Sequence, residues 1–77
     1  MMFATRIWLK DLDKEMVRQI CNKIAKKDET FFFEIKKGFL FIYSKDKDKA
    51  HKRGMIFIKK YLSKFDKNLG YDVIWLK

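Results

Sequence analysis

Apolar and polar residues alternate along four short segments of the chain, a pattern typical of β-strands that are buried on one side. The first segment covers residues 3–10, with one side formed by Phe3, Thr5, Ile7 and Leu9 and the other by Arg6, Trp8 and Lys10. The second and third cover residues 30–36 and 39–44, and are separated by Lys37-Gly38, a two-residue hairpin signal. The fourth covers residues 71–77. The alternation therefore predicts four strands, two of them joined in a hairpin.

Two segments between these strands have the 3.6-residue spacing of amphipathic helices. After an N-cap signal at Asp11 and Asp13, apolar residues recur at helical spacing to about residue 27: Leu12, Met16, Val17, Ile20, Cys21 and Ile24. A second helix is predicted from a cap at Asp46 or Asp48 to about residue 66. Gly54 costs such a helix about 1 kcal/mol. A strand over residues 55–58 is the alternative, but both of its faces would be apolar, so the helix is preferred.

The predicted order is strand–helix–strand–strand–helix–strand. With right-handed crossovers on one sheet, this order gives an α+β fold, the ferredoxin-like βαββαβ sandwich. Its four-stranded antiparallel sheet carries two helices on one face, and the first and third strands are central. Since 77 residues have room for little more than one small core, residues 1–77 are predicted to form a single domain.

The hairpin register assigns each strand residue to one of two sheet faces. The face predicted to lie against the helices holds Ile7, Leu9, Phe31, Phe33, Ile35, Leu40, Ile42, Ile74 and Leu76. The opposite face holds Arg6, Trp8, Lys10, Phe32, Phe39, Phe41, Tyr43, Tyr71, Val73 and Trp75. An uncovered face of an antiparallel sheet is normally polar, yet seven of the 13 aromatic residues fall on this one. An apolar patch of that size indicates a contact surface.

Two segments on the predicted central strands resemble the RNA recognition motif. The third-strand signature of that family is K/R-G-F/Y-G/A-F-V-x-F/Y. The matching segment is Lys37-Gly38-Phe39-Leu40-Phe41-Ile42-Tyr43-Ser44, which departs from the signature at Leu40 and Ser44. The family's first-strand signature is similar to Ile7-Trp8-Leu9-Lys10-Asp11-Leu12, with Trp8 as the aromatic residue and Asp11 in place of Asn. The resemblance implies that Trp8, Phe39 and Phe41 form a platform on which bases stack.

The charge balance favours a polyanionic partner. The chain has 19 Lys and Arg residues against 10 Asp and Glu, a formal net charge of +9. An AT-rich genome also supplies lysine by default, and only Arg6, Arg18 and Arg53 are arginines. The charge run over residues 45–53 has two interpretations, a track for phosphates or a solvated loop and helix start.

The sequence does not contain the residue patterns of the common enzyme and metal-site classes. The lone Cys21 and lone His51 exclude a disulfide framework and a Cys/His zinc cluster. There is no nucleophile–base pair and no Gly-rich phosphate loop. No apolar run approaches the roughly 18 residues that span a bilayer, and the N-terminus has no signal-peptide pattern. We therefore expect a cytoplasmic protein that is not an enzyme, needs no cofactor or metal, and does not enter a membrane.

These patterns lead to two hypotheses about the partner. In the first, the protein binds single-stranded nucleic acid, with RNA as the favoured form, across the aromatic sheet face. The residues expected to stack on bases are Trp8, Phe39, Phe41, Tyr43 and Trp75, and those expected to contact the backbone are Arg6, Lys10, Lys36, Lys37 and Lys77. In the second, the same face binds a partner protein, most simply as a symmetric homodimer. Aromatic residues serve both purposes, so the sequence leaves both open.

Overall fold

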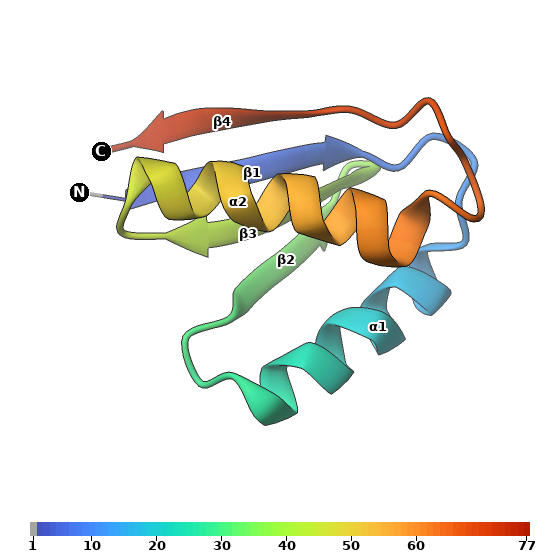
Figure 1. The fold of residues 1–77 in the computed structure, drawn as a ribbon, viewed down its shortest axis with the longest axis horizontal. Coiled ribbons are helices and arrows are strands. Elements are labelled where there is room, and N and C mark those ends of the chain that lie inside the picture. Colours follow the sequence, from blue (N-terminus) through green and yellow to red (C-terminus); the bar gives the residue numbers. More distant parts are fainter. Residues whose placement is uncertain (1) are drawn as a thin grey trace.

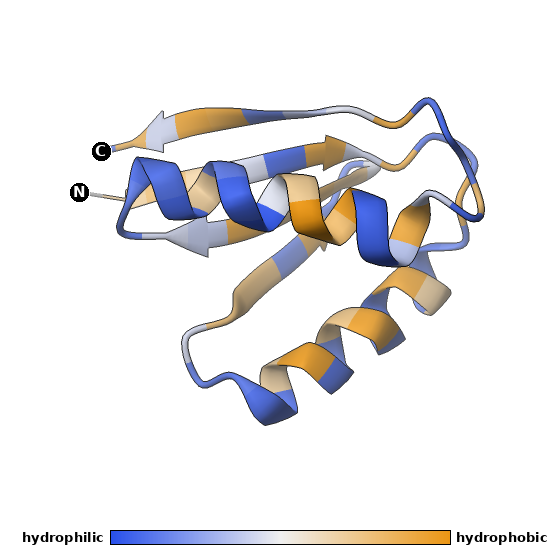
Figure 2. Ribbon diagram, viewed as in Figure 1, coloured by the Kyte–Doolittle hydropathy of each residue, from blue (hydrophilic) through white to orange (hydrophobic). Residues whose placement is uncertain are grey.

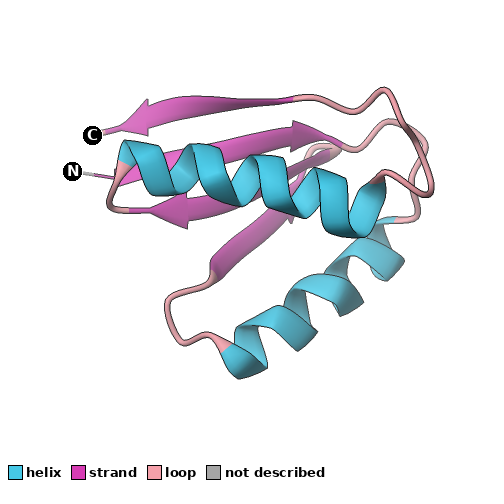
Figure 3. Cartoon of the chain, in the orientation of Figure 1, coloured by secondary structure: helices cyan, strands magenta, loops and turns pink. Residues whose placement is uncertain are grey.

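The computed structural model describes residues 2–77, which form a four-stranded antiparallel sheet with two helices on one side (Figure 1, Figure 3). The elements are β1 (Met2–Trp8), α1 (Lys14–Lys27), β2 (Phe32–Lys36), β3 (Phe39–Ser44), α2 (Lys47–Phe57), the π-helical turn η1 (Ile58–Leu62) and β4 (Tyr71–Leu76). The strand order in the sheet is β2-β3-β1-β4, so β1 and β3 are central. The predicted α+β class, the antiparallel sheet and the two helices are confirmed, and the arrangement is compatible with a ferredoxin-like fold.

The hairpin between β2 and β3 has the predicted register. Ile35 lies opposite Leu40 and Phe33 opposite Ile42, with Lys37 and Gly38 as the two turn residues. Lys37 has a φ of 53° and Gly38 a φ of 80°. Positive φ at both positions is the type I′ geometry, whose twist matches that of the strands it joins. The turn therefore fixes which side chains of β2 and β3 point toward the helices.

Both helices begin at predicted capping residues. The Asp13 carboxylate accepts hydrogen bonds from the backbone amides of Glu15 and Met16, and Asp46 accepts one from the amide of Asp48. Apolar and hydrophilic bands alternate along α1 in Figure 2, as the sequence spacing predicts, whereas the first half of α2 is mostly hydrophilic. Neither α1 nor α2 is long and apolar enough to cross a membrane, and the same holds for the rest of residues 2–77.

The core lies between the sheet and the two helices. Its buried members are Ile7, Leu9, Val17, Cys21, Phe31, Leu40, Ile42, Phe57, Leu62 and Leu69. Helix α2 crosses this face of the sheet, and the buried Thr5 hydroxyl donates a hydrogen bond of 2.6 Å to the carbonyl of Ala50. At Gly54 a Cβ atom would lie only 2.7 Å from Cγ2 of Thr5. The absent side chain therefore lets α2 approach β1 closely, which explains a glycine within a helix.

The prediction of which side chains of β4 point toward the helices, here called the facing of β4, is wrong. Ile7 lies opposite Tyr71, and Phe3 lies opposite Trp75. Since directly opposed residues point to the same side of a sheet, the helix-covered face includes Tyr71, Val73 and Trp75. The uncovered face instead holds Asp72, Ile74 and Leu76. Because β4 has apolar residues on both sides, its alternation alone does not decide between the two facings, and a shift of one residue exchanges them.

Cys21 gives a direct test of the packing of α1. Its side chain is fully buried, and burial raises the pKa of the thiol to about 12. Because the thiolate is the reactive form, we expect no reaction of the folded protein with a thiol-specific reagent at pH 8, and one equivalent of reaction after denaturation. Absorbance of the released chromophore measures both. Rapid labelling without denaturant would show that α1 does not pack Cys21 against the core.

Candidate functional site

The uncovered face of the sheet carries a row of three aromatic residues along the central strand β3. Phe39, Phe41 and Tyr43 are two residues apart, so their side chains point to the same side. The ring centroids of Phe39 and Phe41 are 6.2 Å apart, and those of Phe41 and Tyr43 are 6.5 Å apart. The Phe41 and Tyr43 rings are within 11° of parallel. The row therefore presents aromatic groups at regular steps along the strand.

Two further aromatic residues lie beside this row on the neighbouring strands. Trp8 of β1 lies opposite Phe39, and Phe32 of β2 lies opposite Tyr43. Trp8 is 58% exposed and Phe32 is 63% exposed, so these two side chains are largely open to solvent. We call the five residues Trp8, Phe32, Phe39, Phe41 and Tyr43 the aromatic face. No helix among residues 2–77 covers it (Figure 3).

The two cations on this face are each bound to a carboxylate. The Arg6 guanidinium donates hydrogen bonds of 3.0 and 2.6 Å to the two carboxylate oxygens of Asp72, and its carbon lies 5.8 Å from the Phe39 ring centroid. The Lys36 ammonium is 3.4 Å from Oε1 of Glu34 and 5.2 Å from the ring centroid of Phe41. Arg6 and Lys36 are thus balanced by Asp72 and Glu34. The surroundings of the aromatic rings are close to electrically neutral.

These pairings also shift the ionisation of the groups involved. The hydrogen bond from Arg6 lowers the pKa of Asp72 below its ordinary value. The Tyr43 hydroxyl, which donates a bond of 2.7 Å to Glu34, and then Lys36 lower the pKa of Glu34. Burial, followed by the contact with Glu34, raises the pKa of Tyr43 to about 12. At neutral pH both carboxylates are therefore charged, Tyr43 is protonated, and both ion pairs are present.

The structure brings together six of the ten residues predicted for the site, namely Arg6, Trp8, Lys36, Phe39, Phe41 and Tyr43. Lys37 lies at one end of them, in the hairpin turn. Lys77 follows the last residue of β4 and is exposed.

Lys10 and Trp75 are the two predictions that the structure contradicts. Strand β1 ends at Trp8, so Lys10 lies in a turn with a φ of 55° rather than on the sheet. Its ammonium is 3.7 Å from a carboxylate oxygen of Asp66. Trp75 lies on the helix-covered face, because the facing of β4 is opposite to that predicted.

Asp72 is a member of this face that the sequence patterns did not indicate. With the observed facing of β4, the cross-strand pair of Arg6 and Asp72 follows from strand alternation. Glu34 lies opposite Phe41 in the hairpin register, and its hydrogen bond from Tyr43 has no signature in the sequence.

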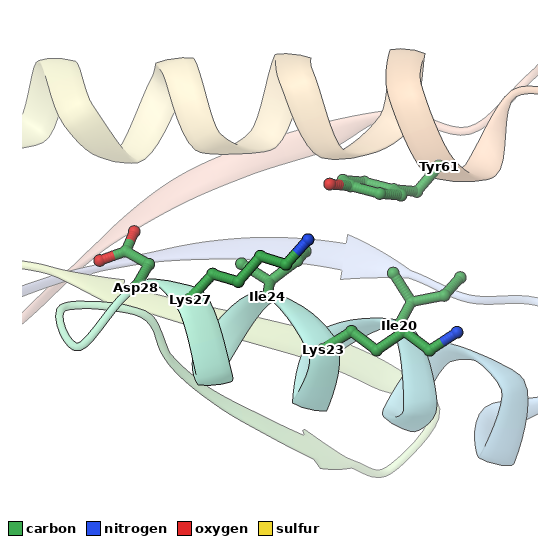
Figure 4. A pocket seen from close by; sticks show the side chains of 6 residues that line it. All are labelled: Ile20, Lys23, Ile24, Lys27, Asp28 and Tyr61. Carbon is green, nitrogen blue, oxygen red and sulfur yellow. The ribbon is translucent and has the colours of Figure 1, made fainter.

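The helix side of the protein has a separate groove of about 430 Å³ between α1 and η1 (Figure 4). Ile20 and Ile24 of α1 and the ring of Tyr61 form its apolar walls, and the side chains of Lys23 and Lys27 extend along it. Within residues 2–77, no group of three or more His, Cys, Asp or Glu side chains is placed to hold a metal ion. The groove is therefore an apolar surface bordered by lysines.

No protein-family model, no curated protein and no solved structure matches this chain. A function is therefore inferred from the geometry of the aromatic face and from the charges around it.

Proposed function

We propose that the protein is a ferredoxin-like domain that binds single-stranded nucleic acid, RNA in the first instance, through its aromatic face. The observation that carries the proposal is the row of three rings on β3 with Trp8 beside it, all on the uncovered side of the sheet. Stacking of one base on an aromatic side chain contributes about 1–3 kcal/mol and does not depend strongly on the identity of the base. A row of several such rings can stack on successive bases of an unpaired strand.

The resemblance to the RNA recognition motif supports the same residues. Trp8, Phe39 and Phe41 match the stacking positions of the two family signatures. They lie on the two central strands, and Trp8 is directly opposite Phe39. The sequence segments and the spatial arrangement thus lead to one set of stacking residues.

A phosphate can bind the cations of this face only by displacing the carboxylates that they already contact. Arg6 and Lys36 already bind Asp72 and Glu34, so a phosphate has to compete with these carboxylates. Lys37 forms no ion pair with any residue of the described chain and is exposed in the turn. We therefore expect stacking to provide most of the affinity of the aromatic face and phosphate attraction to provide less.

Removing the carboxylates should strengthen binding. In the double variant Glu34→Gln/Asp72→Asn, Lys36 and Arg6 become free for phosphates, so affinity for a short RNA strand should rise. The dependence of log K on log salt should steepen by about 0.7 for each additional phosphate that the protein binds. Glu15→Gln on α1 removes a carboxylate on the helix side and is the single-charge control. Titrations at two salt concentrations measure both effects, and unchanged affinity in the double variant would contradict a strand lying over Lys36 and Arg6.

The direct test of the proposal compares a single strand with a duplex, which carries the higher charge density. A fluorescently labelled, unstructured RNA decamer and a labelled duplex of the same length are titrated with the protein, and anisotropy is recorded. Preference for the single strand is the expected result, because stacked bases inside a duplex are not available to Trp8 or Phe39. Equal affinity for both would reduce the binding to general attraction between a basic protein and a polyanion, and would overturn the proposal.

Self-association through the aromatic face is the second candidate function. It is favoured by the ion pairs of that face, because Arg6 and Lys36 keep their own carboxylate partners and burial would leave neither of these two cations unpaired. Exposed Trp and Phe side chains are also enriched in protein interfaces. A symmetric dimer would bury Trp8 and Phe32 of both copies.

Light scattering after size-exclusion chromatography distinguishes the two candidates. A dimer formed through the aromatic face should resist high salt, and Phe41→Glu or Trp8→Glu should convert it to a folded monomer, as checked by circular dichroism. A monomer at all accessible concentrations would contradict self-association. A salt-resistant dimer that does not bind RNA would overturn the nucleic-acid proposal.

A further inference from the structure

A pocket of about 470 Å³ lies at the end of the sheet opposite the Lys37-Gly38 turn. It opens between the start of β2, the end of β3 and the beginning of α2, where the two strands diverge in Figure 1. Its lining includes Phe32, Tyr43, Ser44, Lys45, Lys49 and Arg53. A volume of this size is within the range of about 300–1,000 Å³ that is usual for small-ligand sites. We call this cavity the strand-end pocket.

One wall of the strand-end pocket continues the aromatic face. Phe32 and Tyr43 are direct cross-strand partners, and both line the pocket. Tyr43 is also the last ring of the row on β3, with Phe41 stacked beside it at 6.5 Å. Phe32 and Tyr43 therefore join the strand-end pocket to the aromatic face.

Three cations line the opposite wall, and one of them, Arg53, forms an ion pair with Asp28 at 3.5 Å. Lys45 and Lys49 are exposed, and neither forms an ion pair with any of residues 2–77. Arg53 is different, since its side chain is only 12% exposed and donates hydrogen bonds to the carbonyls of Thr30 at 3.1 Å and Tyr43 at 3.3 Å. Arg53 thus holds the wall in place, while the two lysines remain available to an anion.

Two carboxylates and the hydroxyls of Thr30 and Ser44 complete the polar lining. Asp46 accepts the amide of Asp48 at 2.9 Å as the cap of α2, whereas Glu29 lines the rim. The Ser44 hydroxyl is buried, and among the described residues it has no hydrogen-bond partner. A buried hydroxyl without a partner is uncommon.

We infer that the strand-end pocket takes one nucleotide of the bound strand, with the base against Phe32 and Tyr43 and the phosphate between Lys45 and Lys49. The inference rests on the proposed function for the presence of a strand. Aromatic rings and unpaired ammonium groups in one cavity match a nucleoside monophosphate, which has a flat apolar part and an anion. The strand-end pocket also supplies ammonium groups without an ion-pair partner, whereas Arg6 and Lys36 of the aromatic face are already paired.

The first test compares two double variants of equal net charge. Lys45→Gln/Lys49→Gln should lower affinity for the RNA decamer by about tenfold at 0.1 M salt, and should flatten the salt dependence by about 0.7 for each phosphate that is no longer bound. The matched control is Lys59→Gln/Lys60→Gln, two exposed lysines of η1 on the helix side, which should change affinity less than twofold. Equal effects of both double variants would overturn the pocket inference and leave binding at the aromatic face intact.

The second test uses the unmodified protein and separates the pocket from the proposed function. Amide resonances of residues 32 and 43–45 are followed by NMR during addition of uridine monophosphate, uridine or inorganic phosphate. Uridine monophosphate should shift them most, and Phe32→Ala should remove the difference between the monophosphate and inorganic phosphate. Equal shifts with inorganic phosphate, or no shift with any of the three, would overturn the inference. Failure of the decamer to bind would overturn the proposed function instead.

Discussion

Replacing Trp8 by alanine should weaken binding of a short single strand by about 1–3 kcal/mol, roughly 5- to 150-fold in affinity. One stacking surface on β1 is lost, and the same loss is expected for Phe39→Ala on the neighbouring strand. The matched control is Trp75→Ala, because Trp75 is as exposed as Trp8, at 58%, but lies on the other side of the sheet. It should leave affinity within about twofold of the original, since it touches no part of the aromatic face.

Anisotropy titrations of these three variants, with circular dichroism as the check on folding, decide where the strand lies. An equal loss in Trp8→Ala and Trp75→Ala would mean that binding is not confined to the aromatic face. No loss in either Trp8→Ala or Phe39→Ala would leave only general attraction to the basic protein, and self-association would then be the better explanation of the exposed rings.

Replacing Gly54 by alanine should destabilise the fold by about 1–3 kcal/mol, although alanine favours a helix over glycine by about 1 kcal/mol. The added Cβ would lie 2.6 Å from Cδ2 of Tyr71 and 2.7 Å from Cγ2 of Thr5, so α2 or the Tyr71 ring has to move. Thr5 has little freedom to shift, because it is fully buried and bonded to Ala50. Urea unfolding followed by circular dichroism gives the change in free energy.

Gly70→Ala is the control for the glycine substitution. No atom lies within 4 Å of a Cβ added at Gly70, so we expect a change within about 0.5 kcal/mol. If Gly54→Ala were as stable as the original protein, the close approach of α2 to β1 and β4 would be wrong.

The elements of the fold were predictable because their signals are local. Residue spacing located all four strands and both helices, and the Lys37-Gly38 turn fixed the register of β2 and β3. The facing of β4 was not predictable, since apolar residues occupy both of its sides. It is determined by long-range packing, in which Tyr71 fills the space next to Gly54. The π-helical turn η1 has no marker in the sequence either.

The aromatic part of the candidate site was predictable for the same reason. Phe39, Phe41 and Tyr43 follow from alternation within one strand, and Trp8 from alternation in β1. The ion pairs of this face were not predictable from the sequence. Arg6 and Asp72 are 66 positions apart and meet only through the register of β1 and β4. A net charge of +9 suggested a basic binding face, whereas the structure pairs the cations of that face with carboxylates.

The length of β3 sets the size of any ligand that reaches both ends of the aromatic face. Six residues separate the Lys37-Gly38 turn from the first lysine of the strand-end pocket, and at a rise of about 3.3 Å per residue they span roughly 20 Å. Within this distance, the ring centroids of the row are 6.2 and 6.5 Å apart. The length of β3 therefore sets the distance between Lys37 and Lys45. For a strand bound along this row, we expect a dinucleotide to be too short to contact Lys37 and Lys45 together, and a strand of several nucleotides to be needed to engage both ends.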